Sequence, residues 1–247
     1  MSRVAVITGG ASGIGLGVAQ PFAADGHRVA ILDNNGSLAE AGAAELRADG
    51  ATAFALEVDV TDRGSIDAAY AKIRAELGPI EILVTSAGVE SFDAVLDITP
   101  ETWDRILAVN LTGTFTCVQA ALPDMLASRW GRIVTISSSS AQSGAPNMAH
   151  YAASKGGVIS LTKALAVELS RTGITVNTVT PSLVDTPMAR QAEADGDFPG
   201  VDVVAPMVPL GRAGTPADIA AACAFLCGDG GSYITGQVIG VNGGMYI

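Results

Sequence analysis

The chain has 247 residues, 49% of them hydrophobic, and it carries 25 acidic against 14 basic residues for a formal net charge of -11. This length and apolar content suit one buried core, and a negative balance without a run of Lys or Arg argues against nucleic acid as a partner. We find no leader pattern and no uninterrupted apolar stretch of about 18 residues, so we expect a soluble, cytoplasmic protein with no membrane partner.

Short apolar runs alternate with longer Ala- and Leu-rich periodic stretches along the whole chain. This alternation is typical of βα units that feed a parallel sheet covered on both faces. We predict strands at 4–8, 29–32, 53–58, 82–85, 132–136, 175–179 and 237–241, and helices at 14–24, 38–48, 64–77, 100–127, 151–171 and 216–226. The pattern indicates an α/β fold, a Rossmann-like doubly wound sheet of about seven parallel strands, with residues 1–247 as a single domain.

The first strand is followed by a glycine-rich loop, Thr8-Gly9-Gly10-Ala11-Ser12-Gly13-Ile14-Gly15. Glycines there permit a tight turn and let backbone amides approach a pyrophosphate at a helix N-terminus. The spacing differs from the common G-x-G-x-x-G, so a plain glycine-rich turn is the alternative. Asp33 ends the second strand about 20 residues on, where a carboxylate can bind the adenosine ribose.

Asp33 also predicts which cofactor is bound, because its charge would repel a 2′-phosphate and its neighbours Asn34 and Asn35 offer no cation. NAD is therefore favoured over NADP. The alternative role for Asp33 is that of a turn former. Further cofactor contacts are expected where the third and fourth strands end, at Asp59 and Val60 and at Ser86, Ala87 and Gly88.

The later elements carry two local signals. Thr99, Pro100 and Glu101 predict a helix start, because they supply a cap, a suitable first residue and a charge that favours the helix dipole. The segment 187–211 is rich in Pro, Gly and Asp and interrupts the alternation, so we expect it to be the substrate loop. The three cysteines, Cys117, Cys223 and Cys227, fit no zinc or disulfide framework; we interpret them as reduced core residues and predict no metal site.

Tyr151 and Lys155 lie four residues apart in a predicted helix and so share one face. A nearby cation stabilises a phenolate and lowers the pKa of a tyrosine, which then serves as a general acid or base near neutral pH. Ser138 follows a strand at the same sheet edge, and Asn110 is a polar residue within an apolar helical stretch. Taken singly, these residues also fit a surface pair, a Ser-rich loop and a hydrogen-bonded core amide.

These motifs together resemble the short-chain dehydrogenase/reductase family over essentially the whole chain. The resemblance is carried by Thr8-Gly9-x-x-x-Gly13-x-Gly15, Asn110, Ser138, Tyr151-x-x-x-Lys155 and Pro181-Ser182-x-x-x-Thr186. It implies Tyr151 as acid/base, Ser138 on the substrate oxygen, Lys155 on the nicotinamide ribose and Asn110 on a water of the proton relay. It also implies that Val60 lies by the adenine and that Val184 and Thr186 lie by the nicotinamide. The predicted cofactor contacts are therefore Gly9, Ser12, Gly13, Ile14, Gly15, Asp33, Asp59, Val60, Ser86, Ala87, Gly88, Tyr151, Lys155, Pro181, Val184 and Thr186.

The sequence departs from this family's usual pattern at Ser86, Ser182 and Asn242, where Asn, Gly and Asp are common. We expect an NAD-dependent enzyme, by family analogy a homotetramer, that interconverts a small neutral secondary alcohol and its ketone. The alternatives are an NADPH-type 3-oxoacyl-(acyl-carrier-protein) reductase and a catalytically silent dinucleotide-binding protein. Substrate contacts are expected from Ser139, Ser140, Gln142, Leu183, Met188 and Phe198.

Overall fold

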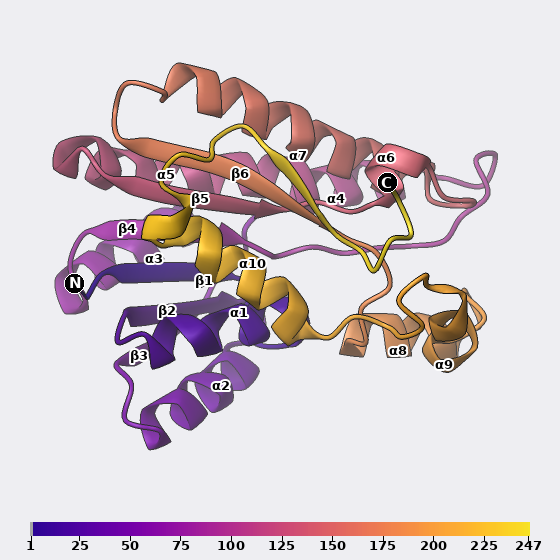
Figure 1. Cartoon of the computed structure of the whole chain (residues 1–247), viewed down its shortest axis with the longest axis horizontal. Helices are drawn as coiled ribbons and strands as arrows, with labels where there is room; N and C mark the ends of the chain where they lie inside the picture. The colour runs from indigo at the N-terminus through magenta and orange to yellow at the C-terminus, as the bar shows by residue number, and fades with distance from the viewer. Residues whose placement is uncertain (1) are drawn as a thin grey trace.

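Seven parallel strands form one sheet in the order β3-β2-β1-β4-β5-β6-β7 in the computed structural model, which describes residues 2–247 (Figure 1). The strands are β1 (Val4–Thr8), β2 (Arg28–Asp33), β3 (Ala53–Glu57), β4 (Ile80–Thr85), β5 (Gly131–Ile136), β6 (Ile174–Pro181) and β7 (Val238–Val241). The predicted α/β, Rossmann-like sheet is confirmed, and each predicted strand is found with ends that differ by at most a few residues.

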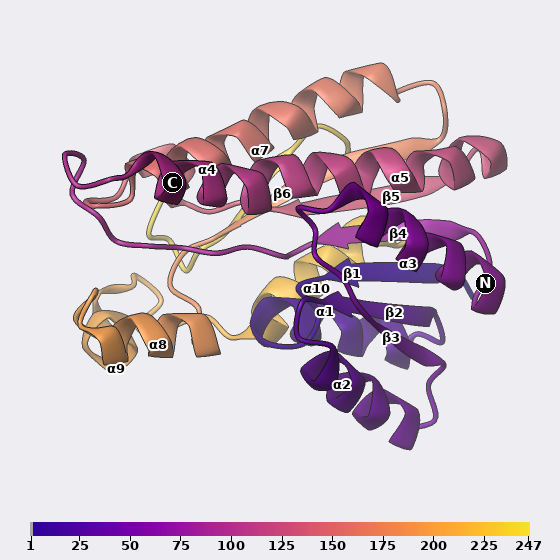
Figure 2. The ribbon, with the colours of Figure 1, turned by 180° about the vertical axis from the view of Figure 1, so that it is seen from behind.

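Helices cover both faces of the sheet, which explains why the strands are apolar throughout (Figure 2). In β1, Val4 and Val6 pack into one core while Ala5 and Ile7 pack into the other. One core is closed by α3 (Arg63–Glu76), α5 (Gly113–Ser128) and α7 (Ala149–Glu168), the other by α1 (Gly13–Ala24), α2 (Gly36–Ala48) and α10 (Pro216–Cys227). The cysteines are buried in these cores and are unbridged.

The strand order reverses at β1, which pairs with β2 on one side and with β4 on the other. Loops leaving these strands diverge at their carboxyl ends and leave a crevice there, the usual ligand site of such sheets. The same end of the sheet carries α6 (Ser140–Ser143), α8 (Pro187–Asp195), α9 (Val201–Val204) and the chain's C-terminal residues (Figure 1).

Two predicted segments differ in the structure. The helix predicted at 100–127 is interrupted: α4 (Pro100–Leu107) passes through a π-helical turn, η1 (Ala108–Thr112), into α5. The segment 187–211 is largely helical, with α8, α9 and a 3-10 turn, η2 (Ala205–Met207); a second 3-10 turn, η3 (Asp229–Gly231), follows α10. Thr186 caps α8 by accepting from the Ala189 amide at 3.2 Å, a local signal that the many Pro and Gly residues of this segment obscure.

The helix start at Thr99 is confirmed, with its hydroxyl accepting from the Thr102 amide at 3.2 Å. The continuous helical run that begins there, Pro100–Ser128, is long and apolar enough to cross a membrane by length and composition alone. However, 44% of its apolar stretch is buried inside the protein, and residues such as Cys117, Val118 and Met125 pack in the core under the sheet. Its composition is therefore that of a core helix.

Candidate active site

A cavity of about 610 Å³ follows the carboxyl ends of the strands from β3 to β6. Its volume lies in the usual range for small-molecule and cofactor sites. Every predicted cofactor contact, from the glycine-rich loop to Thr186, lies on its wall, together with Ser138. The tertiary structure thus brings residues that are more than a hundred positions apart in the chain to one surface.

Glycine is required at two points of the loop after β1. Gly9 has a φ of +63°, and a Cβ there would come within 2.7 Å of the Ala87 backbone. A Cβ on Gly15 would lie 2.0 Å from the Gly9 carbonyl oxygen. Ser12, the N-cap of α1, makes no side-chain capping bond, and no acidic residue occupies the first turn. The first amides of α1 therefore face the cavity as free donors, as a pyrophosphate requires.

Asp33 has the contacts of a turn former and also lines the cavity. Its two oxygens accept from the amides of Ala11 at 3.2 Å and Asn35 at 3.0 Å, so it shapes the loops on either side of it. It is only half-buried and lines the cavity, where its remaining lone pairs are free to accept from ribose hydroxyls. Among residues 2–247, Lys155 is the only cation on the cavity wall.

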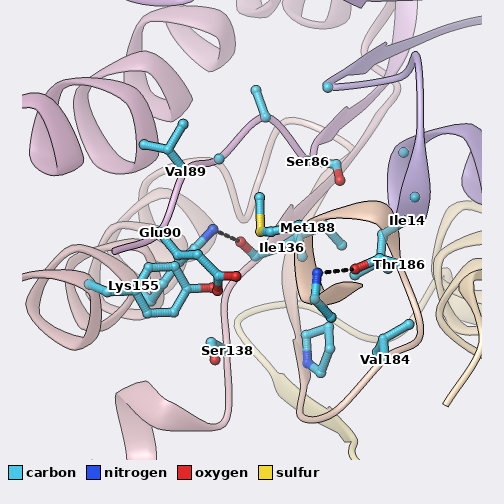
Figure 3. A pocket seen from close by; sticks show the side chains of 18 of the residues that line it. Ile14, Ser86, Val89, Glu90, Ile136, Ser138, Lys155, Val184, Thr186 and Met188 are labelled. Carbon is cyan, nitrogen blue, oxygen red and sulfur yellow. Dashed lines mark hydrogen bonds between the residues drawn. The ribbon is translucent and has the colours of Figure 1, made fainter. Parts of the chain in front are cut away.

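Three of the four predicted catalytic residues, Ser138, Tyr151 and Lys155, line the cavity. Figure 3 shows Ser138 and Lys155 there, at the end away from Ile14 of the glycine-rich loop. Lys155 is buried on α7, donates to the Ile136 carbonyl at 3.0 Å and lies 5.7 Å from the centroid of the Tyr151 ring. The Ser138 hydroxyl oxygen accepts from the Ser140 hydroxyl at 2.8 Å and from its amide at 3.2 Å. Since α7 begins just before Tyr151, both Tyr151 and Lys155 are held by the first turns of one rigid helix.

Burial controls the ionisation of these groups. It raises the pKa of Tyr151 well above its usual value, an effect that the Glu90 carboxylate reinforces and a hydrogen bond with Ser138 opposes. Burial also lowers the pKa of Lys155 to about 8, while Glu90 acts in the opposite direction. The sequence leads us to expect that Lys155 together with an oxidised nicotinamide lowers the pKa of Tyr151. Among the protein's own groups, the cost of desolvating a phenolate outweighs the positive charge of Lys155. The side chains of this protein favour the neutral phenol, the form that donates a proton.

Asn110 lies behind the cavity wall and not on it. It is fully buried in η1, and its side chain accepts from the Val89 amide at 2.9 Å and donates to the Val89 carbonyl at 3.0 Å. Its second N–H donates to the Ser154 hydroxyl at 3.1 Å, and Ser154 in turn donates to the Tyr151 carbonyl at 2.7 Å. Asn110 therefore ties the loop after β4 to the helix that carries Tyr151.

Replacing Asn110 by Ala is expected to lower the free energy of unfolding by about 2 kcal/mol, because it leaves two backbone groups of Val89 without a partner. Chemical denaturation measures the change. The matched control is Gln119→Ala, which removes an amide from the exposed face of α5 and should cost less than about 0.5 kcal/mol. Equal stability of the two variants would contradict the connecting role of Asn110.

The departures from the family pattern have local partners. The Ser182 hydroxyl donates to the Asn242 carbonyl at 2.9 Å, so two of the three unusual residues bind each other. The Asn242 side chain accepts from the Gly244 amide and donates to the Tyr246 carbonyl, which closes a turn and places Met245 on the cavity wall. Ser86 lines the cavity and donates its amide to the Thr8 carbonyl at 3.2 Å.

The residues that line the cavity differ from the predicted substrate contacts at two positions. Gln142 is exposed on α6 and does not line the cavity, whereas Ser139, Ser140, Leu183, Met188 and Phe198 do. Glu90 lines the cavity but is not among the site residues predicted from the sequence. The signal that could have identified it is a lone acidic residue directly after Ser86-Ala-Gly-Val, at a strand end where ligands bind.

Comparison with known proteins gives related matches over nearly the whole chain. A family model described as enoyl-(acyl carrier protein) reductase matches residues 9–246. The 3-oxoacyl-(acyl-carrier-protein) reductase MabA of Mycobacterium tuberculosis is 38% identical over 245 residues, which cover 99% of this chain and 93% of that protein. The 2-(S)-hydroxypropyl-CoM dehydrogenase 3 of Xanthobacter autotrophicus is 40% identical over 246 residues, covering 99% and 96%. A solved actinorhodin polyketide ketoreductase variant with NADPH has a TM-score of 0.95 at 36% identity, covering 99% and 97%.

Proposed function

The chain belongs to the short-chain dehydrogenase/reductase family, and from this premise we propose that it prefers NAD(H) and uses Tyr151 as the acid/base that interconverts a secondary alcohol and its ketone. It is an oxidoreductase of this family that acts on CH–OH and ketone carbons and takes a nicotinamide dinucleotide. The observation that supports the proposal most is the shared cavity of the glycine-rich loop and of Ser138, Tyr151 and Lys155.

When bound, NAD(H) supplies or accepts the hydride at the reacting carbon. Tyr151 donates its phenolic proton to the carbonyl oxygen in reduction and takes the proton from the carbinol in oxidation. Ser138 accepts two hydrogen bonds from Ser140, which leaves its own hydrogen for the Tyr151 oxygen or, once a substrate is bound, for the substrate oxygen. Lys155 holds the nicotinamide ribose and places a positive charge beside the phenol.

The preference for NAD rests on charge at the adenosine end of the cavity. Asp33 and Asp59 both line that end, and the only cation on the cavity wall among residues 2–247, Lys155, lies at the catalytic end. A 2′-phosphate on the ribose would meet a carboxylate without a compensating cation.

We expect kcat/KM with NAD(H) to exceed that with NADP(H) by at least about tenfold. Asp33→Asn, which keeps one acceptor oxygen for the loop, should reduce this ratio severalfold by removing the charge. Steady-state rates with both cofactors measure the ratio. Glu57→Gln at the exposed end of β3 is the control and should leave it unchanged. Equal use of both cofactors by the wild type would overturn the assignment.

The rival activity is that of an NADPH-dependent 3-oxoacyl-(acyl-carrier-protein) reductase, which the names of the relatives favour. An acidic carrier protein would bind basic side chains, but three arginines of this chain lie at the amino-terminal ends of β5 and β6, away from the cavity. Arg129 and Arg171 are exposed before β5 and β6, and Arg132, at the start of β5, is buried with its guanidinium 4.4 Å from the centroid of the Trp130 ring. The cavity lies at the other end of these strands, so a carrier protein bound to these arginines would lie away from the cavity mouth.

Segment 187–211 is proposed as the substrate loop because Met188, Ala192, Phe198 and Val204 contribute to the cavity wall. Arg190 holds this segment together through ion pairs with Asp185, Glu193 and Asp202.

Assembly as a homotetramer is part of the proposal and is supported by the exposed apolar side chains of Phe115, Leu126 and Val167 on α5 and α7. A cytoplasmic location is supported by the three unbridged thiols.

The test of the function is a panel of secondary alcohols and ketones, with acyl thioesters included, in which NADH absorbance is followed and NADP(H) is run in parallel. Turnover of simple alcohols and ketones with NAD(H) supports the proposal. Turnover confined to acyl thioesters with NADPH would establish the rival activity.

A further inference from the structure

Glu90 brings a carboxylate into the catalytic half of the cavity. It lies in the segment between β4 and α4, is half-buried and lines the cavity wall. Figure 3 shows its side chain extending toward the part of the cavity that holds Lys155 and Ser138. Its charge acts on Tyr151 and Lys155, which line the same cavity.

This carboxylate has charged neighbours but no hydrogen-bond partner. Among residues 2–247, its ionisation is influenced by burial, by Lys155 and by Asp197, and by no hydrogen bond. The Lys155 amine instead donates to the Ile136 carbonyl. A part-buried carboxylate that loses its water when a substrate fills the cavity needs a donor in exchange, because an unpaired charged acceptor is costly.

The catalytic proton transfers give no reason for this charge. Glu90 raises the pKa of Tyr151 and so opposes formation of the phenolate that oxidation requires. Burial raises the pKa of Glu90 itself, while Lys155 partly offsets that effect. Since the positive charge of Lys155 is already close by, a neutral donor suits this site better than a second cation, and an anion is repelled.

We propose that Glu90 is a specificity-determining residue that accepts a hydrogen bond from a hydroxyl group on the carbon next to the reacting one. The substrates are then vicinal diols and the matching α-hydroxy ketones. This inference rests on the proposed function, since it assumes that Ser138 and Tyr151 bind the reacting oxygen. Glu90 lines the same cavity as Ser138 and Tyr151, so it can meet a hydroxyl next to an oxygen that these two residues bind.

The first test measures binding without turnover, in the complex of the enzyme with NADH. Titration calorimetry compares 1,2-butanediol with 2-butanol, which differ by one hydroxyl group. The wild type is expected to bind the diol about tenfold more tightly. Glu90→Leu should bring this ratio close to one, and Glu90→Gln, which keeps an acceptor oxygen, should retain part of it. Asp197→Asn, which removes a neighbouring exposed carboxylate, is the control and should keep the wild-type ratio.

The second readout is how strongly Glu90 disfavours a negatively charged ligand relative to a neutral one. The wild type should bind 2-hydroxybutanoate at least about tenfold more weakly than 2-butanol, and Glu90→Gln should reduce this difference severalfold.

A third readout is the pH profile of alcohol oxidation. Its midpoint should move to lower pH in Glu90→Gln, because the carboxylate that raises the pKa of Tyr151 is gone. The charged and titratable groups around Glu90 are Tyr151 and Lys155 on α7 and Asp197 after α8.

The outcomes separate this inference from the proposed function. A wild type that does not distinguish the diol from 2-butanol, or a Glu90→Leu variant that keeps the wild-type ratio, overturns the role of Glu90. Diol-selective binding that depends on Glu90 but leads to no oxidation of any alcohol supports that role while refuting the proposed reaction. The Gln variant is isosteric, so its charge and pH readouts stand even where the Leu variant folds poorly.

Discussion

Tyr151→Phe is expected to lower kcat by about 10³-fold in both directions and at every pH, while the affinity for NAD(H) stays almost unchanged. The phenol is the acid/base in the proposed reaction, and α7 holds it beside Lys155 and Ser138 in the cavity. Phenylalanine keeps the ring and its packing but carries no proton. Steady-state kinetics across pH, with NADH binding followed by fluorescence, measure both quantities.

The control for this substitution is Tyr70→Phe, which removes a phenolic hydroxyl from the core between α3 and α5, away from the cavity. It should leave kcat within about twofold of the wild type. If Tyr151→Phe kept more than about a tenth of the wild-type rate, another group or water would be the proton donor, and the proposed role of Tyr151 would be abandoned.

Ser138→Ala is expected to lower kcat by about 10²-fold or more with little change in NAD(H) affinity. The Ser138 oxygen already accepts two hydrogen bonds from Ser140, so in the proposed reaction its remaining capacity is to donate, which suits a substrate oxygen. Removing that donor leaves the developing charge on the substrate oxygen less stabilised. Rates with one alcohol and its ketone, measured at saturating cofactor, give the loss.

Ser140→Ala is the matched variant, because it removes the hydroxyl that orients Ser138 and leaves Ser138 itself in place. Its loss should be severalfold, well below that of Ser138→Ala. An unaffected rate in Ser138→Ala would move the role to Ser139, the next serine on the cavity wall. Ser137 is unsuited to it, since its buried hydroxyl donates to the Lys155 carbonyl at 2.8 Å.

Local and periodic signals were enough to predict the sheet, the glycine-rich turn and the shared helix face of Tyr151 and Lys155. Apolar runs that alternate with helical stretches predict a parallel sheet covered on both faces, and the glycines after β1 are required by the turn itself. The Thr99 cap and the spacing of Tyr151 and Lys155 depend only on helix geometry, so both could be predicted without the fold.

Contacts between distant segments determined the remainder. Asn110 lies in a π-helical turn that no local pattern predicts, and from there it forms hydrogen bonds with Val89 and Ser154. Helix α8 lies in a segment whose composition is typical of a loop. The burial that raises the pKa of Tyr151 could not be predicted, because the sequence gives the distance to Lys155 along a helix but not the degree of burial. Glu90 was missed for the same reason.

The sequence by itself determined the sheet and the glycine-rich turn, because these follow from periodicity and turn chemistry within single elements. Its motifs also carried the resemblance to the family, and that resemblance supplied the candidate reactive side chains. Only the tertiary structure decided how those side chains are solvated and which charges face them. Desolvation and the field of Glu90 depend on how the segment after β4, helix α7 and the segment after α8 pack together, and no short stretch of sequence contains that information.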